Sequence, residues 1–238
     1  MPRFFCPVAL QANTSIDLPD ALAHHALRVL RLPAGTAITL FDGQGGQYPA
    51  VLQAEGRRAW AQLGPQMAIE CELQGQLTLV QGIASGDKMD WIIEKAVELG
   101  VQTVVPIAAE RSVLRLNGPR LEKRLAHWRA IVQSASEQCG RNRLLQVREP
   151  APLASCLPTL NGPVLFAHPD GAQPFAQALQ PVTQQLTLMV GPEGGWSNTE
   201  LDLAQRHGLQ PVRFGTRVLR TETAGLAMAA AATALLGW

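Results

Sequence analysis

Two patterns of apolar and polar positions divide the chain. From about residue 77 onward, short runs rich in β-branched and aliphatic residues alternate with longer segments whose apolar residues recur every three or four positions. The short runs predict buried strands, and the longer segments predict amphipathic helices. We predict strands over residues 77–84, 101–107, 144–147, 163–168, 186–190 and 211–214, and helices over 88–99, 120–138, 197–208 and 224–238. This alternation predicts an α/β fold with a mostly parallel sheet.

The first seventy or so residues follow a different pattern. Short extended segments over 4–10, 37–41, 48–53 and 58–63 are separated by turn signals such as Asp42–Gly46. One helix is predicted over 20–30, with Asp20 as its cap. This arrangement is typical of a small β-barrel. Because the pattern changes near residues 70–76, we predict two domains, 1–72 and 73–238.

Two glycine-bearing loops follow predicted strands of the second domain. Gly191–Gly195 is a stretch where glycine lets the main chain approach a ligand closely, and the Ser197–Glu200 segment after it matches a capping box that starts a helix. The second loop carries Arg217, Arg220 and Glu222 among small and apolar neighbours. Charges in such surroundings need partners, and ligands of α/β sheets bind at the carboxyl ends of strands. The two loops therefore predict a ligand site rather than two plain turns.

Charge is unevenly distributed along the 238 residues, although the net charge is only +1. Residues 110–150 contain nine basic and four acidic side chains, which gives +5 by nine minus four. Nearly all of these cations are arginine, whose fork suits phosphate. The segment thus indicates an anionic partner such as nucleic acid, with a solvated helix face as the alternative.

The cysteines and the apolar runs indicate the cellular compartment of the protein. Cys6, Cys71, Cys139 and Cys156 are scattered without metal-ligand spacing, so we expect reduced thiols in a cytoplasmic protein and no bound metal. The opening residues lack a long apolar core, and the C-terminal apolar run is short and mostly alanine. We expect neither a signal peptide nor a membrane span.

The loop residues resemble a known family. Two stretches are similar to the signature of the RsmE-type 16S ribosomal RNA uridine N3-methyltransferases, which belong to the SPOUT superfamily. They are Gly191-Pro192-Glu193-Gly194-Gly195, followed by Ser197 and Glu200, and the later stretch Gly215–Ala224. Further similarity at residues 25–31, 41–43, 88–101 and 136–143 extends the resemblance over nearly the whole chain. The chain departs from the family at Thr216, where proline is usual; this loosens a turn and removes no charged group.

The resemblance implies a fold and an assembly. It implies an N-terminal PUA-like RNA-binding β-barrel and a C-terminal SPOUT methyltransferase domain with a deep trefoil knot. It also implies a homodimer. The terminal helix, with its small side chains, suits a close helix contact between subunits; burial within one subunit is the alternative.

The implied reaction transfers the methyl group of S-adenosylmethionine to N3 of a uridine in 16S rRNA of the small ribosomal subunit. The implied cofactor-binding residues are His168, Pro169, Gly191, Pro192, Glu193, Gly194, Gly195, Phe214, Gly215, Val218, Leu219, Thr221, Thr223 and Ala224. The implied catalytic residues are Arg217 and Arg220, which would grip phosphate or an anionic uracil, and Glu222 as base. Glu193 is a second candidate base, and Glu222 alternatively pairs with Arg220 or caps the last helix. The implied RNA contacts are Arg3, Arg28, Arg31, Glu137, Arg141 and Arg143.

Two other functions stay open, and a third is disfavoured. The same fold could methylate a tRNA or another rRNA site, or the chain could be a PUA-type RNA-binding module with a degenerate cofactor site. A Rossmann-type nucleotide enzyme is disfavoured, because the glycines lack the G-x-G-x-x-G order after the first strand.

Overall fold

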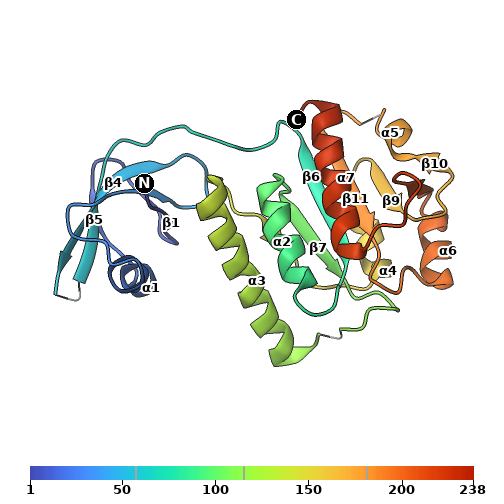
Figure 1. Ribbon diagram of the computed structural model, residues 1–238, viewed down its shortest axis with the longest axis horizontal. Helices are drawn as coiled ribbons and strands as arrows, with labels where there is room; N and C mark the ends of the chain where they lie inside the picture. The colour runs from blue at the N-terminus through green and yellow to red at the C-terminus, as the bar shows by residue number, and fades with distance from the viewer. Residues whose placement is uncertain (57, 115, 181) are drawn as a thin grey trace. The chain divides into compact units, whose positions relative to one another are not determined.

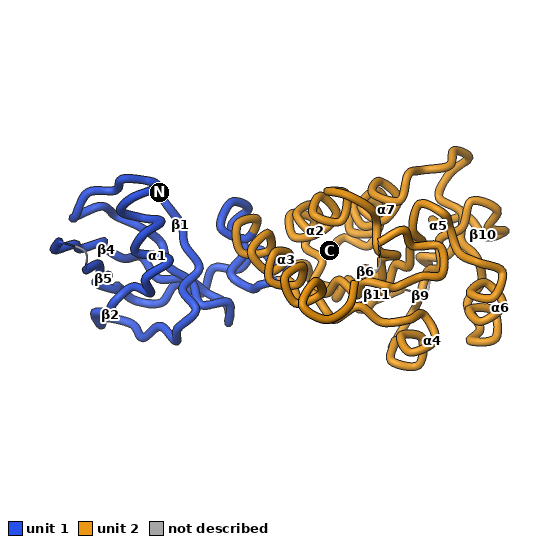
Figure 2. The backbone as a smooth tube through the Cα atoms, turned by 90° about the horizontal axis from the view of Figure 1, so that it is seen from below, with its two compact units in different colours: residues 1–72, 136–144 blue, residues 73–135, 145–238 orange. Residues whose placement is uncertain are grey.

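The computed structural model describes residues 1–56, 58–114, 116–180 and 182–238. Arg57, Arg115 (one of the basic residues counted above) and Pro181 therefore lie outside the described residues. The chain divides into two compact units, drawn in two colours in Figure 2. The smaller unit comprises residues 1–72 and 136–144, and the larger unit comprises residues 73–135 and 145–238.

The larger unit contains a seven-stranded sheet in which every strand pairing is parallel (Figure 1). Its strands are β6 (Gln76–Gly82), β7 (Thr103–Ile107), β8 (Gln146–Val147), β9 (Val164–Ala167), β10 (Gln173–Pro174), β11 (Gln185–Val190) and β12 (Pro211–Arg213). Their order is β10-β12-β9-β11-β6-β7-β8. The prediction of a mostly parallel α/β sheet is confirmed. The short edge strand β10, with a proline as its second residue, was not predicted.

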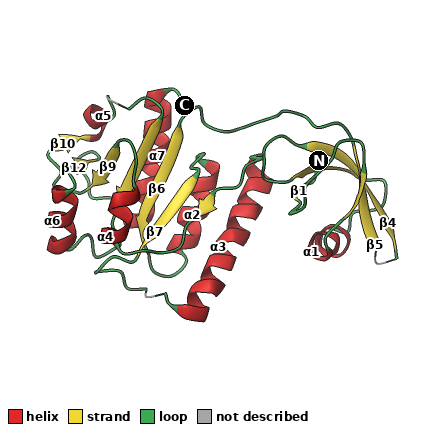
Figure 3. Cartoon of the chain, turned by 180° about the vertical axis from the view of Figure 1, so that it is seen from behind, coloured by secondary structure: helices red, strands yellow, loops and turns green. Residues whose placement is uncertain are grey.

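Helices cover both faces of this sheet. On the face turned to the viewer in Figure 1, α7 (Thr221–Leu236) packs against α2 (Lys88–Glu98), β6 and β11. A Cβ on Gly225 would lie only 2.9 Å from Leu79 Cδ1, so this glycine allows α7 to approach β6 closely. The adjacent residue Val80 points to the other face. There it packs in an apolar cluster with residues of α4 (Leu153–Cys156) and α6 (Asn198–Arg206); α4 is in front in Figure 3.

The remaining helices of this part of the chain are α3 (Gly118–Cys139), the 3-10 helix η2 (Leu157–Thr159) and α5 (Phe175–Ala178). The predicted capping box is confirmed at the start of α6. Ser197 Oγ accepts from the Glu200 amide at 3.1 Å, and Glu200 Oε2 accepts from the Ser197 amide at 2.9 Å. The cap fixes where the loop after β11 ends and the helix begins.

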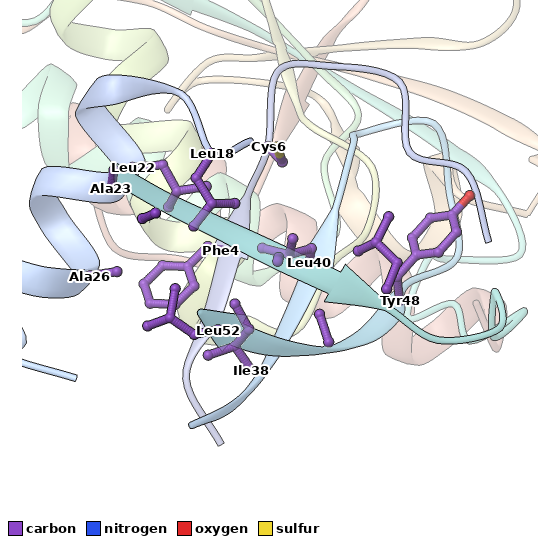
Figure 4. Packing of buried hydrophobic residues seen from close by; sticks show 14 of the residues in the cluster. Phe4, Cys6, Leu18, Leu22, Ala23, Ala26, Ile38, Leu40, Tyr48 and Leu52 are labelled. Carbon is purple, nitrogen blue, oxygen red and sulfur yellow. The ribbon is translucent and has the colours of Figure 1, made fainter. Parts of the chain in front are cut away.

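The smaller unit is built on a five-stranded sheet in the order β1-β3-β4-β5-β2. Its strands are β1 (Arg3–Phe5), β2 (Ser15–Asp17), β3 (Ala37–Phe41), β4 (Tyr48–Glu55) and β5 (Arg58–Leu63). β1 pairs with β3 in parallel, and the other pairings are antiparallel. Figure 4 shows the core of this unit, in which Phe4, Leu40 and Leu52 pack beneath the helix residues Leu22 and Ala26.

Three local predictions in this unit were wrong. The strand expected over residues 4–10 ends at Phe5, and the three-residue strand β2 was missed. The predicted helix is present as α1 (Asp20–His24) continued by a π-helical turn, η1 (His25–Val29). Its N-cap is Pro19, so Asp20 lies in the first turn rather than at the cap. An acidic residue there still interacts favourably with the helix dipole.

Candidate active site

A cavity of about 490 Å³ lies in the larger unit, where the loops after three strands meet. β9, β11 and β12 are parallel neighbours, with β9 between the other two, so their carboxyl ends share one edge of the sheet. The chain leaves these ends at His168, Gly191 and Phe214, and all three residues line the cavity. The two glycine-bearing loops singled out in the sequence are therefore brought together at one site.

Most of the predicted site residues line this cavity. They are His168, Pro169, Gly191, Pro192, Glu193, Gly195, Phe214, Arg217, Val218, Leu219, Arg220, Thr221, Glu222 and Ala224. Three others do not line it: Gly194, Gly215 and Thr223. The Thr223 amide donates to Arg220 O at 2.9 Å in the first turn of α7, so it is not available to a ligand. Gly215 lines a separate groove beside Phe175 and Leu235.

Gly194 is required for a different reason. A Cβ at this position would lie 2.9 Å from Arg111 Cβ, closer than such atoms approach. Its carbonyl also accepts a hydrogen bond from Arg111 Nη1 at 3.2 Å. Gly194 thus lets the loop pack on the chain that follows β7, while its neighbour Gly195 supplies a positive φ of 67° for the turn.

Sequence reasoning missed nine residues of the cavity wall. They are Lys88, Arg111, Ala167, Asp170, Val190, Trp196, Val212, Arg213 and Met228. Lys88 starts the helix that follows β6, and the carboxyl end of β6 lies at the same edge of the sheet as those of β9, β11 and β12. The rule that ligands bind at the carboxyl ends of parallel strands could therefore have identified Lys88. Met228 follows Thr221 and Ala224 at helical spacing on α7. Trp196, which stacks on Phe166, carried no sequence signal beyond its place after the glycines.

Thr221 connects the two loops by hydrogen bonds. Its hydroxyl donates to Gly191 O at 2.5 Å and accepts from Gln81 Nε2 at 2.9 Å. Gln81 is fully buried on β6, so this hydrogen-bond chain is shielded from water. These hydrogen bonds therefore hold the start of α7, the first glycine of the earlier loop and strand β6 together as one unit.

Glu193 is fixed as a carboxylate. Its Oε1 accepts from the Ser85 amide at 2.9 Å, from Ser85 Oγ at 2.7 Å and from Lys88 Nζ at 3.1 Å. Burial raises the pKa of Glu193, but hydrogen bonds from Ser85 and Lys88 outweigh it and lower the pKa to about 2. A group with so low a pKa is a poor base, which argues against the hypothesis that Glu193 takes the substrate proton.

Glu222 has a different environment. Its Oε2 lies 3.5 Å from Lys88 Nζ, so the ion pair in the described structure is with Lys88 rather than with Arg220. The same buried oxygen has no hydrogen-bond partner among the described residues. The N-cap of α7 is Arg220, which makes no side-chain cap bond, and Glu222 lies in the first turn. Glu222 therefore lines the cavity with a side chain that is 20% exposed, while its Oε2 is buried beside Lys88.

The cavity fits a nucleoside-sized ligand. Its volume lies within the range of small-molecule sites. Buried polar atoms of its wall that lack a partner in the described chain are Trp196 Nε1, a donor, and Glu222 Oε2, an acceptor. Arg217 and Arg220 are exposed residues of the same wall and offer guanidinium groups to an anion. A polar cofactor with both donors and acceptors would satisfy these groups.

The residues predicted to contact RNA all belong to the smaller unit, but not all of them face solvent. Arg3 lies 4.4 Å over the Phe41 ring, and its Nη2 donates to Arg141 O at 2.9 Å and to Asn142 Oδ1 at 2.6 Å. Burial lowers the pKa of Arg3. Glu137 Oε1 accepts from a backbone amide of β1 at 2.9 Å. These two side chains hold residues 136–144 in the smaller unit and remain partly exposed, so RNA contact by them stays a prediction.

Arg141, in contrast, is buried, which argues against its prediction as an RNA contact. Its side chain is only 3% exposed and donates to both carboxylate oxygens of Glu72, at 2.9 and 2.6 Å. A buried, forked ion pair leaves no face of the guanidinium for phosphate. Arg28, Arg31 and Arg143 are exposed, Arg143 being 54% exposed and 3.5 Å from Glu70 Oε1. RNA contact by these three stays a prediction.

Two further observations concern the part of the chain that the structure describes. It contains no group of three or more His, Cys, Asp or Glu side chains that could hold a metal ion. None of its helices combines the length and the apolar character that crossing a bilayer requires.

The fold and the cavity define an α/β protein that binds a ligand at the carboxyl ends of parallel strands. The family model described as RNA methyltransferase domain matches residues 71–233, and the model described as RNA methyltransferase PUA domain matches residues 18–60. The chain belongs to this RNA methyltransferase family, which includes proteins named ribosomal RNA small subunit methyltransferase E. The family inferred from the sequence is thereby confirmed.

Individual relatives cover almost the whole chain. Ribosomal RNA small subunit methyltransferase E of Synechocystis is 33% identical over 238 residues, which cover 94% of this chain and 74% of the relative. A crystal structure of the protein of that name from Neisseria gonorrhoeae, bound to S-adenosyl methionine, is 39% identical with a TM-score of 0.92, covering 99% and 98% of the two chains. A Legionella pneumophila methyltransferase in complex with the same cofactor is 29% identical with a TM-score of 0.91, covering 98% and 97%.

Proposed function

We propose that this protein is an S-adenosylmethionine-dependent methyltransferase that modifies N3 of a uridine in 16S rRNA of the small ribosomal subunit. One observation carries the proposal: in a chain of the RNA methyltransferase family, both glycine-bearing loops line one cavity of nucleoside size. The two solved structures described above, which resemble this chain over almost its full length, hold S-adenosylmethionine. Such a substrate would also require a cytoplasmic location, which stays a prediction.

The main chain of the two loops would hold the cofactor. Gly191 and Gly195 present backbone without side chains, the amides of Val218 and Leu219 would meet the adenine edge, and His168 with Pro169 would form a third wall. Trp196 Nε1 would donate to a polar group of the bound molecule. S-adenosylmethionine, when bound, supplies a methyl group on a positively charged sulfur that leaves as a neutral thioether.

Glu222 is the base we propose. The N3–H proton of uracil would pass to the Glu222 carboxylate while N3 forms its bond to the methyl carbon; the carbon–sulfur bond breaks, and its electron pair stays on sulfur. Arg217 and Arg220 would stabilise the negative charge that develops on the uracil, because guanidinium groups are suited to an anionic partner. Holding the base and the donor in line would supply a large part of the rate enhancement.

The two parts of the chain would divide the work. We propose that residues 1–72 form a PUA-like barrel that binds RNA and that residues 73–238 form the SPOUT methyltransferase domain with a trefoil knot. The matched PUA model supports the first role. For the knot, the support is the family resemblance and the path of the chain, which runs from β12 past the loop after β11 to reach α7 against β6.

We also propose a homodimer that forms through α7. Leu235 on this helix is 63% exposed, and Ala230 and Ala234 are exposed beside it. Small side chains would let a second helix approach closely. Sedimentation of the wild type should give twice the mass of one chain, and Leu235→Glu should give the monomer; a monomeric wild type would refute the dimer.

Methyl transfer from tritium-labelled S-adenosylmethionine to small subunits from a strain lacking the family enzyme tests the activity. Label should enter the 16S rRNA and be recovered as N3-methyluridine. Absence of transfer with folded, cofactor-binding protein would refute the proposal. Label that enters tRNA or another rRNA instead would favour a methyltransferase of the same fold with a different substrate, and absence of cofactor binding would favour a PUA-type binding module.

A further inference from the structure

Lys88 reaches two of the three carboxylates of the cavity wall, Glu193 and Glu222. It is the first residue of α2, and its Nζ lies 3.1 Å from Glu193 Oε1 and 3.5 Å from Glu222 Oε2. Glu193 belongs to the loop after β11, whereas Glu222 belongs to the first turn of α7. The ammonium group thus joins the two loops electrostatically, on the side of the cavity formed by α2.

The two carboxylates are held to different degrees. Glu193 accepts two further hydrogen bonds from Ser85, at 2.9 Å from its amide and 2.7 Å from its hydroxyl, so its position is fixed from the β6–α2 connection. Oε2 of Glu222 has the Lys88 ion pair but no hydrogen bond within the described chain. Glu193 therefore anchors the lysine, and the lysine in turn orients Glu222.

The ionisation states agree with this arrangement. The hydrogen bond to Glu193 raises the pKa of Lys88, so its ammonium stays charged at neutral pH. Glu193, with a pKa of about 2, stays an anion. Arg111, His168, Asp170, Arg213, Arg217 and Arg220 are the other charged or titratable groups of the cavity wall. Lys88 is the cation that the described structure places in an ion pair with Glu222.

We propose that Lys88 is a positioning residue for methyl transfer: anchored on Glu193, its ammonium orients the Glu222 carboxylate toward the accepting base. This inference rests on the proposed function, with Glu222 as base. Without this ion pair, the Glu222 carboxylate would be free to turn away from the accepting base.

The test compares Lys88→Met, which keeps the length without the charge, with Lys88→Arg, which keeps the charge. Lys88→Met should lower kcat for transfer to small subunits by about 10- to 100-fold and change the KM for S-adenosylmethionine by less than about threefold. Lys88→Arg should retain most of the rate. Lys95→Met is the matched control on the same helix, since Lys95 pairs with Glu94 and Glu98 instead.

Two more measurements separate positioning from folding. In a Glu222→Gln background, Lys88→Met should have no further effect on kcat, because both act through one carboxylate. A crystal structure of Lys88→Met without cofactor should show the Glu222 carboxylate displaced while the glycine loops keep their conformation.

Several outcomes would overturn the inference. One is a wild-type rate in Lys88→Met, and another is independent multiplicative losses in the double variant. A third is equal impairment of Lys88→Met and Lys88→Arg with thermal stability lowered. If the wild type transfers no methyl group, the proposed function fails first. If the wild type is active and Lys88→Met behaves like it, only this inference fails.

Discussion

The hydroxyl of Thr221 donates a hydrogen bond of 2.5 Å to the carbonyl oxygen of Gly191, thirty positions earlier in the chain. The two residues begin α7 and the loop after β11, two segments that both line the cavity. The same hydroxyl accepts from Gln81 Nε2 at 2.9 Å, and Gln81 lies fully buried on the interior strand β6. The geometry of the cavity therefore depends on the Thr221 hydroxyl, which makes its hydrogen bonds within the protein rather than to a ligand.

Replacing this hydroxyl tests that dependence. Thr221→Val keeps the branched shape but removes the donor to Gly191 and the acceptor for Gln81, so it should lower the free energy of unfolding by about 1–3 kcal/mol. Calorimetry should also find S-adenosylmethionine binding weakened by about tenfold, because the loops lose their common tie. Thr223→Val, at an exposed position of the same helix, is the control. Unchanged affinity in Thr221→Val would contradict the role of this hydrogen bond.

Glu200 is expected to matter more for stability than its place in a cap suggests. Its Oε2 accepts from the Ser197 amide at 2.9 Å, and its Oε1 accepts from the Glu110 amide at 3.0 Å, in a side chain that is 5% exposed. Glu200→Ala leaves both amides without this acceptor and should cost about 2–4 kcal/mol in urea unfolding. The neighbouring exposed substitution Thr199→Ala should stay within about 0.5 kcal/mol. Equal effects of the two would contradict the prediction.

Glu193 predicts a pH dependence of stability. Its pKa is about 2 in the folded chain against 4.5 for the unperturbed group, so its ionised form stabilises the fold. This stabilisation is fully present above about pH 4.5 and is lost as the pH falls toward 2. The difference in unfolding free energy between the wild type and Glu193→Gln should therefore be constant near neutrality and shrink across that window. Urea titrations at several pH values measure it, with Glu122→Gln on α3 as an exposed control; a difference that does not shrink would contradict the shifted pKa.

Much of the larger unit could be predicted because its signals are local. The run Leu186–Val190 is apolar at every position except Thr187, and β11 occupies it; Ser197 and Glu200 stand at capping-box spacing, and the box forms. The carboxyl ends of parallel strands lie at the same edge of a sheet, and from this rule the two loops could be predicted to form one site. These inferences needed only neighbouring residues and a topological rule.

What could not be predicted depends on partners distant in sequence. Arg141 stands in an arginine-rich stretch, and composition could not distinguish a phosphate contact from its buried pair with Glu72, 69 positions away. Lys88 had no visible role until Glu193 and Glu222, more than 100 positions later, were brought beside it. The strand β2 has only three residues, of which Ile16 alone is apolar, so it carries too little pattern to detect.

The reassignment of Arg141 can be tested against Arg143. Arg141→Ala leaves Glu72 without its forked partner and should destabilise the protein by about 3 kcal/mol, with the salt dependence of RNA binding unchanged in the folded fraction. Arg143→Ala removes an exposed cation and should reduce the slope of log affinity against log salt by about one, with little loss of stability. Filter binding at several salt concentrations and urea unfolding separate the two. A reduced slope in Arg141→Ala would restore that residue to the RNA interface.

Arg220 is the side chain whose loss should affect catalysis with the least effect on folding. It is exposed in the cavity wall and precedes α7 as its N-cap residue without a side-chain cap bond, so Arg220→Ala should change the free energy of unfolding by less than about 0.5 kcal/mol. Methyl transfer should nevertheless fall by at least about 100-fold, because charge developing on the uracil loses a guanidinium. Arg220→Lys should recover little of the rate, since an ammonium cannot reproduce the forked contact. Arg206→Ala, at an exposed position in the last turn of α6, controls for the general loss of an arginine. Full turnover in Arg220→Ala with normal cofactor binding would remove Arg220 from the reaction and leave Arg217 as the guanidinium to examine.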